Sequence, residues 1–200
     1  MSLSSFTSST SERSYRAAGV LFIDPTRPSS SSQILLAIQP RKQHKGSQYL
    51  HVLGGRRDNE DRNSVDTCCR ELYEESGYIL PTTFFEEFLN IYNKGNMKTL
   101  YFKTGCYSLY LVDITYFSES HQEVLRSLPD KFNELFPNAS HGEITSLLWV
   151  NLQDFLASMR DFTLKLAKFV HSNGDEFEVS YFATSIFRRG VVNNFLSTFR

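Results

Sequence analysis

The chain has 200 residues, of which 40% are hydrophobic and 22% charged, and a formal net charge of -1. This length suits one globular domain that can bury a core of useful size. The small net charge excludes a strong overall attraction to nucleic acid or to an anionic membrane, so an anionic ligand has to be bound by a local basic patch.

The N-terminal segment and the cysteines indicate the cellular compartment in which we expect the protein. Residues 1–14 are rich in serine and threonine and poor in apolar side chains, so we expect a disordered tail there and a single domain over 15–200. The three cysteines form no sensible disulfide framework and suit a reducing compartment. No secretory signal and no run of about 18 apolar residues is present. We therefore expect a cytoplasmic protein without a membrane partner, with the nucleus left open.

Two buried strands begin the predicted fold, at 16–24 and 33–39, because both segments are short apolar runs that end in turn-forming residues. Pro40 ends the second strand and opens a polar, basic loop. A short strand at 49–53 follows and runs into the pair Gly54-Gly55. A glycine pair permits a tight backbone turn whose carbonyl group can approach a metal.

A central helix comes next, from Asn63, which can cap its start, to Gly77, which can end it in a left-handed conformation. Its apolar face is expected to pack into the core through Val65, Cys68 or Cys69, and Leu72.

Strands and helices alternate over the rest of the chain. We predict antiparallel strands at 84–92, 98–102 and 107–115, a helical region at 122–136 that Pro129 breaks, a strand at 143–150, a helix at 152–159 and a helical segment at 180–199 that Gly190 weakens. Strands before and after a central helix, with a helical C-terminal end, predict an α/β fold: an α/β/α sandwich with a mixed parallel and antiparallel sheet.

Three glutamates of the central helix, Glu71, Glu74 and Glu75, lie at positions i, i+3 and i+4, so their carboxylates leave the helix on one face. Like charges this close repel each other unless a cation compensates them. Hard divalent ions prefer oxygen ligands and also bind phosphates. The cluster therefore indicates a metal-dependent phosphate enzyme, and the alternative is a solvated surface helix.

The string Arg70-Glu71-Leu72-Tyr73-Glu74-Glu75-Ser76-Gly77-Tyr78 resembles the second half of the signature of the Nudix hydrolases, G-x5-E-x7-R-E-U-x-E-E-x-G-U, where U is a bulky apolar residue. Every defined position from Arg70 to Gly77 matches. The resemblance implies a Nudix-type α/β/α sandwich that hydrolyses a diphosphate bond. It covers roughly residues 16–156.

The first half of the signature departs from the family pattern. Counted from Gly55, the first acidic position holds Asp61, with eight residues between it and Arg70. Counted from Gly54, that position holds Glu60, with nine residues following. Either acidic residue can be the ion-pair partner that the family gives to Arg70.

The resemblance also implies the metal site. Glu71, Glu74 and Glu75 would bind Mg²⁺ or Mn²⁺ together with the carbonyl of Gly54. A later strand of the family supplies another carboxylate before an apolar-Trp sequence, and Glu143 is the candidate here because the segment 143–150 is similar to that strand.

The remaining roles follow from the same resemblance. Metal ions would neutralise the diphosphate and lower the pKa of the attacking water. Glu71 or Glu143 would take the proton from that water, and both alternatives stay open. Arg70 is expected to organise the loop. Trp149 is expected to pack in the core.

The substrate is expected to be a phosphorylated small molecule. Arg41, Lys42 and Lys45 of the basic loop precede the strand that enters the glycine turn, so they can bind additional phosphates; a solvated loop is the alternative. This loop and the start Arg16-Ala17-Ala18-Gly19 are similar to diphosphoinositol polyphosphate and diadenosine polyphosphate hydrolases. The box is also similar to that of mRNA decapping enzymes, although no extended basic face for RNA is visible.

Two further alternatives stay open. A Nudix domain without activity could bind a nucleotide or a partner protein, although such a module has no need of mutually repelling carboxylates. The aromatic segment after Leu156 can complete the core, cover the substrate pocket or form a homodimer contact, and core is the expected role.

Overall fold

The computed structural model describes residues 15–26, 32–40, 48–103, 105–137, 144–160, 166–196 and 198–199. Its strands are β1 (Ala17–Asp24), β2 (Gln33–Pro40), β3 (Gln48–His51), β4 (Leu53–Arg56), β5 (Lys98–Phe102), β6 (Tyr107–Asp113), β7 (Ser146–Asn151), β8 (Lys168–Val170) and β9 (Glu176–Val179). Its helices are α1 (Ser64–Glu75), α2 (Thr82–Asn93), η2 (Ile114–Tyr116), α3 (Glu119–Leu135), α4 (Leu152–Ser158), α5 (Tyr181–Phe187) and α6 (Gly190–Leu196). In the described part of the chain, no helix is both long and apolar enough to cross a membrane.

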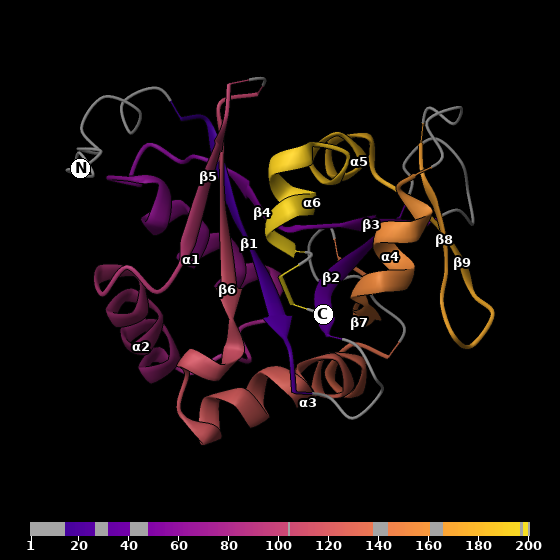
Figure 1. Ribbon diagram of the computed structural model, residues 1–200. Coiled ribbons are helices and arrows are strands. Elements are labelled where there is room, and N and C mark those ends of the chain that lie inside the picture. The colour runs from indigo at the N-terminus through magenta and orange to yellow at the C-terminus, as the bar shows by residue number, and fades with distance from the viewer. Residues whose placement is uncertain are drawn as a thin grey trace.

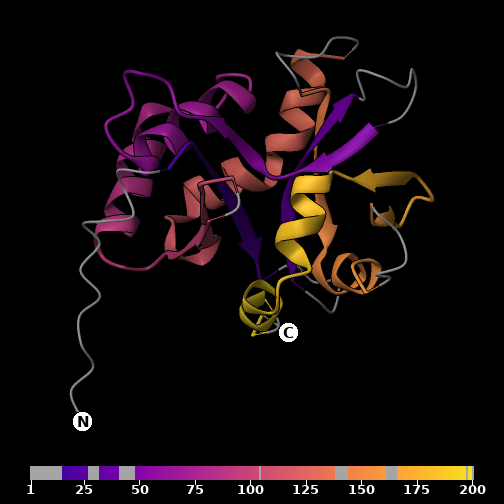
Figure 2. The ribbon, with the colours of Figure 1, turned by 90° about the horizontal axis from the view of Figure 1, so that it is seen from above.

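One mixed sheet forms the centre of the molecule, with helices on both of its faces (Figures 1 and 2). The cores on its two faces are separate: one includes residues of α1, α2 and α3, and the other includes residues of α4, α5 and α6. Successive side chains of β1 alternate between them, since Val20 and Phe22 face the first core and Leu21 and Ile23 the second. The predicted α/β/α sandwich with a mixed sheet is confirmed.

Strand β1 changes partner along its length. It runs parallel to β6 on one side, from the pair Ala17 and Tyr107 to the pair Ile23 and Asp113. On the other side its first half pairs with β4, and its last two residues pair with β2. This change brings the glycine pair of β4 beside the start of β1, where Gly54 lies opposite Gly19. The glycine pair is therefore part of a strand that the sheet holds in place.

The segment 84–92 was predicted as a strand, and this prediction is wrong because it forms helix α2. Phe84, Phe88 and Ile91 are its buried residues, and their spacing of four and three residues is that of a helix face. Packing of this face outweighed the β-propensity of Phe and Tyr. The strands at 98–102 and 107–113 do pair antiparallel, as predicted.

Helix α3 is continuous through Pro129, so the predicted break is absent. Proline lacks the N–H that would bond to the carbonyl four residues earlier, which belongs to Leu125. The indole Nε1 of Trp149 donates to this carbonyl at 3.2 Å. The buried Trp149 thereby compensates the helix for its missing bond, and its predicted place in the core is confirmed.

The C-terminal part differs in detail from the sequence prediction. The segment 180–199 contains two helices, because α5 ends before α6 begins at Gly190. The hairpin of β8 and β9, which extends the sheet beyond β3, was not predicted. Several aromatic residues of this part are buried in the core, as expected: Phe155, Phe169, Phe177 and Phe187. The predicted tail 1–14 lies outside the described residues.

Candidate active site

Helix α1 presents the predicted glutamates and is fixed at both ends as its sequence indicated. The Asn63 side chain accepts hydrogen bonds from the backbone amides of Val65 (3.0 Å) and Asp66 (2.9 Å). Gly77 follows the helix with a φ of 70°. The buried face includes Val65, Cys68 and Leu72, so Cys68 rather than Cys69 takes the core position.

Asp61, not Glu60, is the acidic residue that pairs with Arg70. A turn joins the backbone amide of Asp61 to the carbonyl of Asp58 at 3.2 Å and leaves Glu60 exposed. The Asp61 carboxylate accepts from Arg70 at 3.2 and 3.0 Å and from the Thr67 hydroxyl at 2.8 Å. This turn accommodates the extra residue of the loop and still brings an acid to the guanidinium.

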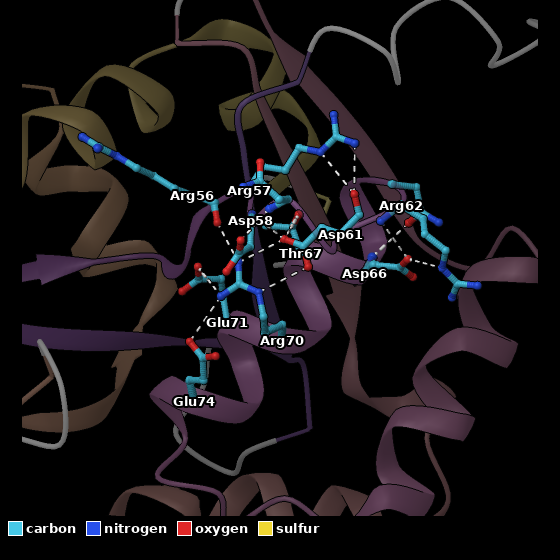
Figure 3. Close-up of polar contacts among 12 residues, drawn as sticks. Arg56, Arg57, Asp58, Asp61, Arg62, Asp66, Thr67, Arg70, Glu71 and Glu74 are labelled. Atoms are coloured by element: carbon cyan, nitrogen blue, oxygen red, sulfur yellow. Dashed lines mark hydrogen bonds and ion pairs between the residues drawn. The ribbon is translucent and has the colours of Figure 1, made fainter.

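The guanidinium of Arg70 is shared among several acceptors (Figure 3). One terminal nitrogen donates to the carbonyl of Arg56 at 2.7 Å and to Asp61. The other terminal nitrogen lies 2.9 Å from a carboxylate oxygen of Glu71 and 3.3 Å from one of Glu74. Arg70 thus ties the loop, β4 and α1 together, and its expected role as an organiser agrees with these contacts.

The glycine pair lies against the other carboxylates. A Cβ added at Gly55 would lie 2.4 Å from the carboxyl carbon of Glu71, so only glycine leaves room for that side chain. The backbone amide of Gly54 donates to Glu75 at 2.6 Å. Gly54 has a φ of 142°, a conformation that favours glycine. Glu71 and Glu75 therefore both meet the glycine pair directly.

The charges of this network shift two pKa values in opposite directions. Burial opposes ionisation of Asp61, but the hydrogen bonds from Arg70, the Asp58 amide and Thr67 outweigh it and lower the pKa of Asp61. Burial raises the pKa of Glu71; Arg70 lowers it in part, and Glu74 and Asp61 raise it further, so the net pKa shift is upward. The charge of Glu71 is thus less well compensated than that of Asp61.

The donor atoms fit a divalent cation in kind, since carboxylate and carbonyl oxygens are the ligands that Mg²⁺ prefers. Within the ranges described, however, no group of three or more His, Cys, Asp or Glu side chains is arranged to hold a metal ion. Arg70 already lies close to both Glu71 and Glu74, so an ion shared by these two would compete with it for their oxygens. The metal assignments of Gly54, Glu71, Glu74 and Glu75 stay predictions.

Four predicted site residues cannot be placed. Glu143, the candidate fourth carboxylate, lies outside the described residues. The same is true of Arg41, Lys42 and Lys45 of the basic loop. Their predicted roles therefore stay predictions.

Three solved structures resemble this fold. A C. elegans Ap4A hydrolase in a binary complex is 15% identical, with a TM-score of 0.38 over 71% of this chain and 84% of its own. A NUDIX hydrolase from Alicyclobacillus acidocaldarius is 13% identical, with a TM-score of 0.40 over 75% and 85%. The T. brucei MERS1-RNA complex is 15% identical, with a TM-score of 0.36 over 73% and 55%.

The likeness is partial at these TM-scores and identities and does not decide the activity. No protein-family model matches the chain, and a comparison with curated proteins gives no match.

Two contributors to the network were missed from the sequence. Thr67 bonds to both Asp61 and the Tyr15 hydroxyl, the latter at 3.2 Å. The backbone carbonyl of Arg56 accepts a hydrogen bond from Arg70. The role of Thr67 could have been suspected, because it is a polar residue on the apolar side of α1. The role of the Arg56 carbonyl could not, because every residue has a backbone carbonyl.

Proposed function

We propose that this chain is a metal-dependent Nudix-type hydrolase that cleaves a diphosphate bond in a phosphorylated small molecule. The observation that carries this proposal is the single guanidinium of Arg70 shared by Asp61, Glu71 and Glu74 beside the glycine pair. The matched string from Arg70 to Gly77 supports it independently. A local excess of carboxylates beside a glycine turn favours capture of a cation together with a phosphate.

In the proposed mechanism, Glu71, Glu74, Glu75 and the carbonyl of Gly54 would hold Mg²⁺ or Mn²⁺. When bound, the ion would neutralise the diphosphate oxygens and lower the pKa of the attacking water. Arg70 would keep the loop and the helix in register through Asp61 and the Arg56 carbonyl, which holds the glycine turn in place. The chain's own contribution is then positioning and negative charge.

A carboxylate must take the proton of the attacking water. Glu71 is one candidate for this general base, because its carboxylate lies beside the glycine pair within the carboxylate network. Glu143 is the alternative base from the family pattern. Replacing each with Gln and comparing turnover with Mg²⁺ affinity would separate a base from a ligand that only binds metal.

The substrate class we favour carries several phosphates, such as a dinucleoside or diphosphoinositol polyphosphate. The basic residues Arg41, Lys42 and Lys45 would receive the phosphates beyond the one attacked. The exposed side chain of Arg56, the last residue of β4, would add to them. Capped RNA is the competing substrate.

A panel of substrates tests the activity: a polyphosphorylated inositol, a dinucleoside polyphosphate, an ADP-sugar and a capped RNA, each with Mg²⁺. We expect turnover of at least one, lost with EDTA and reduced about a hundredfold in Glu74→Gln. Glu86→Gln on the exposed face of α2 is the matched control and should retain full turnover.

Negligible turnover of all four compounds, equal in wild type and Glu74→Gln, would contradict the proposal and favour a binding module without activity. If the enzyme is active, a double Arg41→Ala, Lys42→Ala variant should lose its preference for the most highly charged substrate. An unchanged preference would remove the basic loop from the substrate site.

A further inference from the structure

Tyr107, the first residue of β6, carries a polar atom that the fold leaves without a partner. Its side chain is only 4% exposed. Its hydroxyl makes no hydrogen bond to any of the residues that the structure describes. Native proteins pair nearly all of their buried polar groups, so a lone buried hydroxyl requires an explanation.

This hydroxyl approaches the glycine turn of the candidate site from the face of the sheet that α4, α5 and α6 cover. A Cβ added at Gly19 would lie 2.0 Å from the hydroxyl oxygen, and one added at Gly54 would lie 2.9 Å from it. Gly19 and Gly54 are register partners in β1 and β4, so the hydroxyl reaches across β1 to β4. The amide of Gly54 is the group that Glu75 binds. Because neither glycine has a side chain, none lies between the hydroxyl and the Gly54 peptide.

Packing accounts for the ring of Tyr107 but not for its oxygen. The ring meets Phe182 of α5 edge to face, with centroids 4.5 Å apart. Phenylalanine would make the same ring contact and would not bury an unpaired oxygen, which lowers stability. A hydroxyl kept at such a cost is expected to be used in a state of the protein that includes a ligand.

We propose that the Tyr107 hydroxyl donates a hydrogen bond to an oxygen atom that arrives with the ligand of the glutamate site. This inference rests on the proposed function and adds a residue to it. The acceptor is an oxygen of the bound diphosphate or of a water bound with the metal ion. A phenol can donate to either, because it is protonated at neutral pH.

The same strand offers a matched control. Tyr110 is 1% exposed and lies on the opposite face of β6, but its hydroxyl has a partner, the Ser64 hydroxyl of α1 at 2.7 Å. Tyr107→Phe and Tyr110→Phe therefore both remove a tyrosine hydroxyl from β6. Tyr107→Phe removes the hydroxyl without a partner, and Tyr110→Phe removes the one that is hydrogen-bonded. Urea unfolding and calorimetric binding of methylenediphosphonate, a diphosphate that resists hydrolysis, would be measured for both variants.

We expect Tyr107→Phe to keep or raise the urea midpoint and to bind methylenediphosphonate with Mg²⁺ about tenfold more weakly, since it loses one bond to a charged acceptor. Tyr110→Phe should lower the urea midpoint and leave the affinity unchanged. Titration with Mg²⁺ alone identifies the acceptor: a weaker ion affinity in Tyr107→Phe indicates an ion-bound water, and an unchanged one indicates a phosphate oxygen.

Two results would overturn the inference while the proposed function stands. One is equal affinity of wild type and Tyr107→Phe for both probes. The other is a lower urea midpoint in Tyr107→Phe, as in Tyr110→Phe, because the hydroxyl would then have a partner within the protein. A wild type that binds neither probe and hydrolyses no diphosphate would overturn both proposals together.

Discussion

Two buried aspartates of this protein are each paired with an arginine, and the two surroundings differ. Asp24, at the end of β1, is fully buried and lies 2.9 Å from the Arg126 guanidinium of α3. Its other oxygen accepts from the amide and the hydroxyl of Thr26. Asp61 has similar bonds to Arg70, but there Glu71 and Glu74 share the same guanidinium.

The difference is one of charge balance. Among the described residues, Arg126 forms an ion pair with one carboxylate, which we call the balanced pair, and Arg70 with three, which we call the unbalanced one. Burial opposes the charge of Asp24, but the bonds to Arg126 and Thr26 lower its pKa overall. Around Arg70 the pKa of Asp61 is lowered while that of Glu71 is raised. The balanced pair joins two elements, whereas the proposed function assigns a further cation to the carboxylates of the unbalanced one.

The same substitution at both aspartates tests whether only the pair at the glycine turn affects turnover. Asp61→Asn should lower kcat/KM about tenfold, because Arg70 would lose the charged loop partner that, together with the Arg56 carbonyl, holds it against the glycine turn. Asp24→Asn should leave kcat/KM within about twofold, since that pair lies at the end of β1 away from the turn. Both variants should lose about 1 to 3 kcal/mol of unfolding free energy, because each leaves a buried arginine bond unmade. Steady-state kinetics and urea unfolding measure the two effects separately.

An equal loss of kcat/KM in both variants would show that the two pairs act alike, through stability alone. Asp61 would then have no specific role at the site. Activity is therefore to be expressed per folded molecule, at a temperature well below the lower of the two unfolding midpoints.

Local patterns predicted the parts of the fold that local interactions determine. The Asn63 cap, the left-handed Gly77 and the strands β1 and β2 depend on neighbours in sequence, and all agree with the structure. Helix α2 was missed because Phe84 and Phe88 have β-propensity. The segment forms a helix because these residues pack against β1. Helix α3 keeps Pro129 because Trp149, distant in sequence, supplies the donor.

The site residues likewise divide into those that local spacing predicts and those that only the folded chain brings together. Arg70 and its glutamates were found because α1 places them on one face at fixed spacing. The choice between Glu60 and Asp61 depended on the turn at Asp58, which residue counting does not show. Tyr107 gave no signal at all, because its approach to Gly54 depends on how three strands are ordered in the sheet.

Acid is expected to weaken the balanced pair of Asp24 and Arg126. The pKa of Asp24 is lower in the folded protein than in the unfolded chain, so its contribution to stability is present above the unfolded value of about 3.9 and is lost as pH falls through the folded value. Wild type should therefore exceed Asp24→Asn in unfolding free energy by about 1 to 3 kcal/mol at pH 7, and the gap should shrink below pH about 4. Urea unfolding from pH 7 to pH 3 measures this gap, and a constant gap would contradict the assignment.

The smallest expected effect concerns the arginines that flank the unbalanced pair. Arg57 donates to the carbonyl of Asp61 and covers the Tyr15 ring, and Arg62 pairs with Asp66 at 2.9 Å. The exposed Arg56 side chain makes no ion pair within the described part of the chain, and it points away from Arg70 (Figure 3). Among the residues that the structure describes, Arg56 is therefore a local cation that can meet a phosphate.

Arg56→Gln should raise KM about threefold and leave kcat unchanged, because an exposed charge pair contributes only about 0.5 to 1 kcal/mol. Its effect should fade as salt screens the charge. Arg62→Gln removes the same charge from an arginine that already has a partner, so it should change KM less. Equal changes in the two variants would mean that only the net charge of the surface matters, and Arg56 would then have no special place at the site.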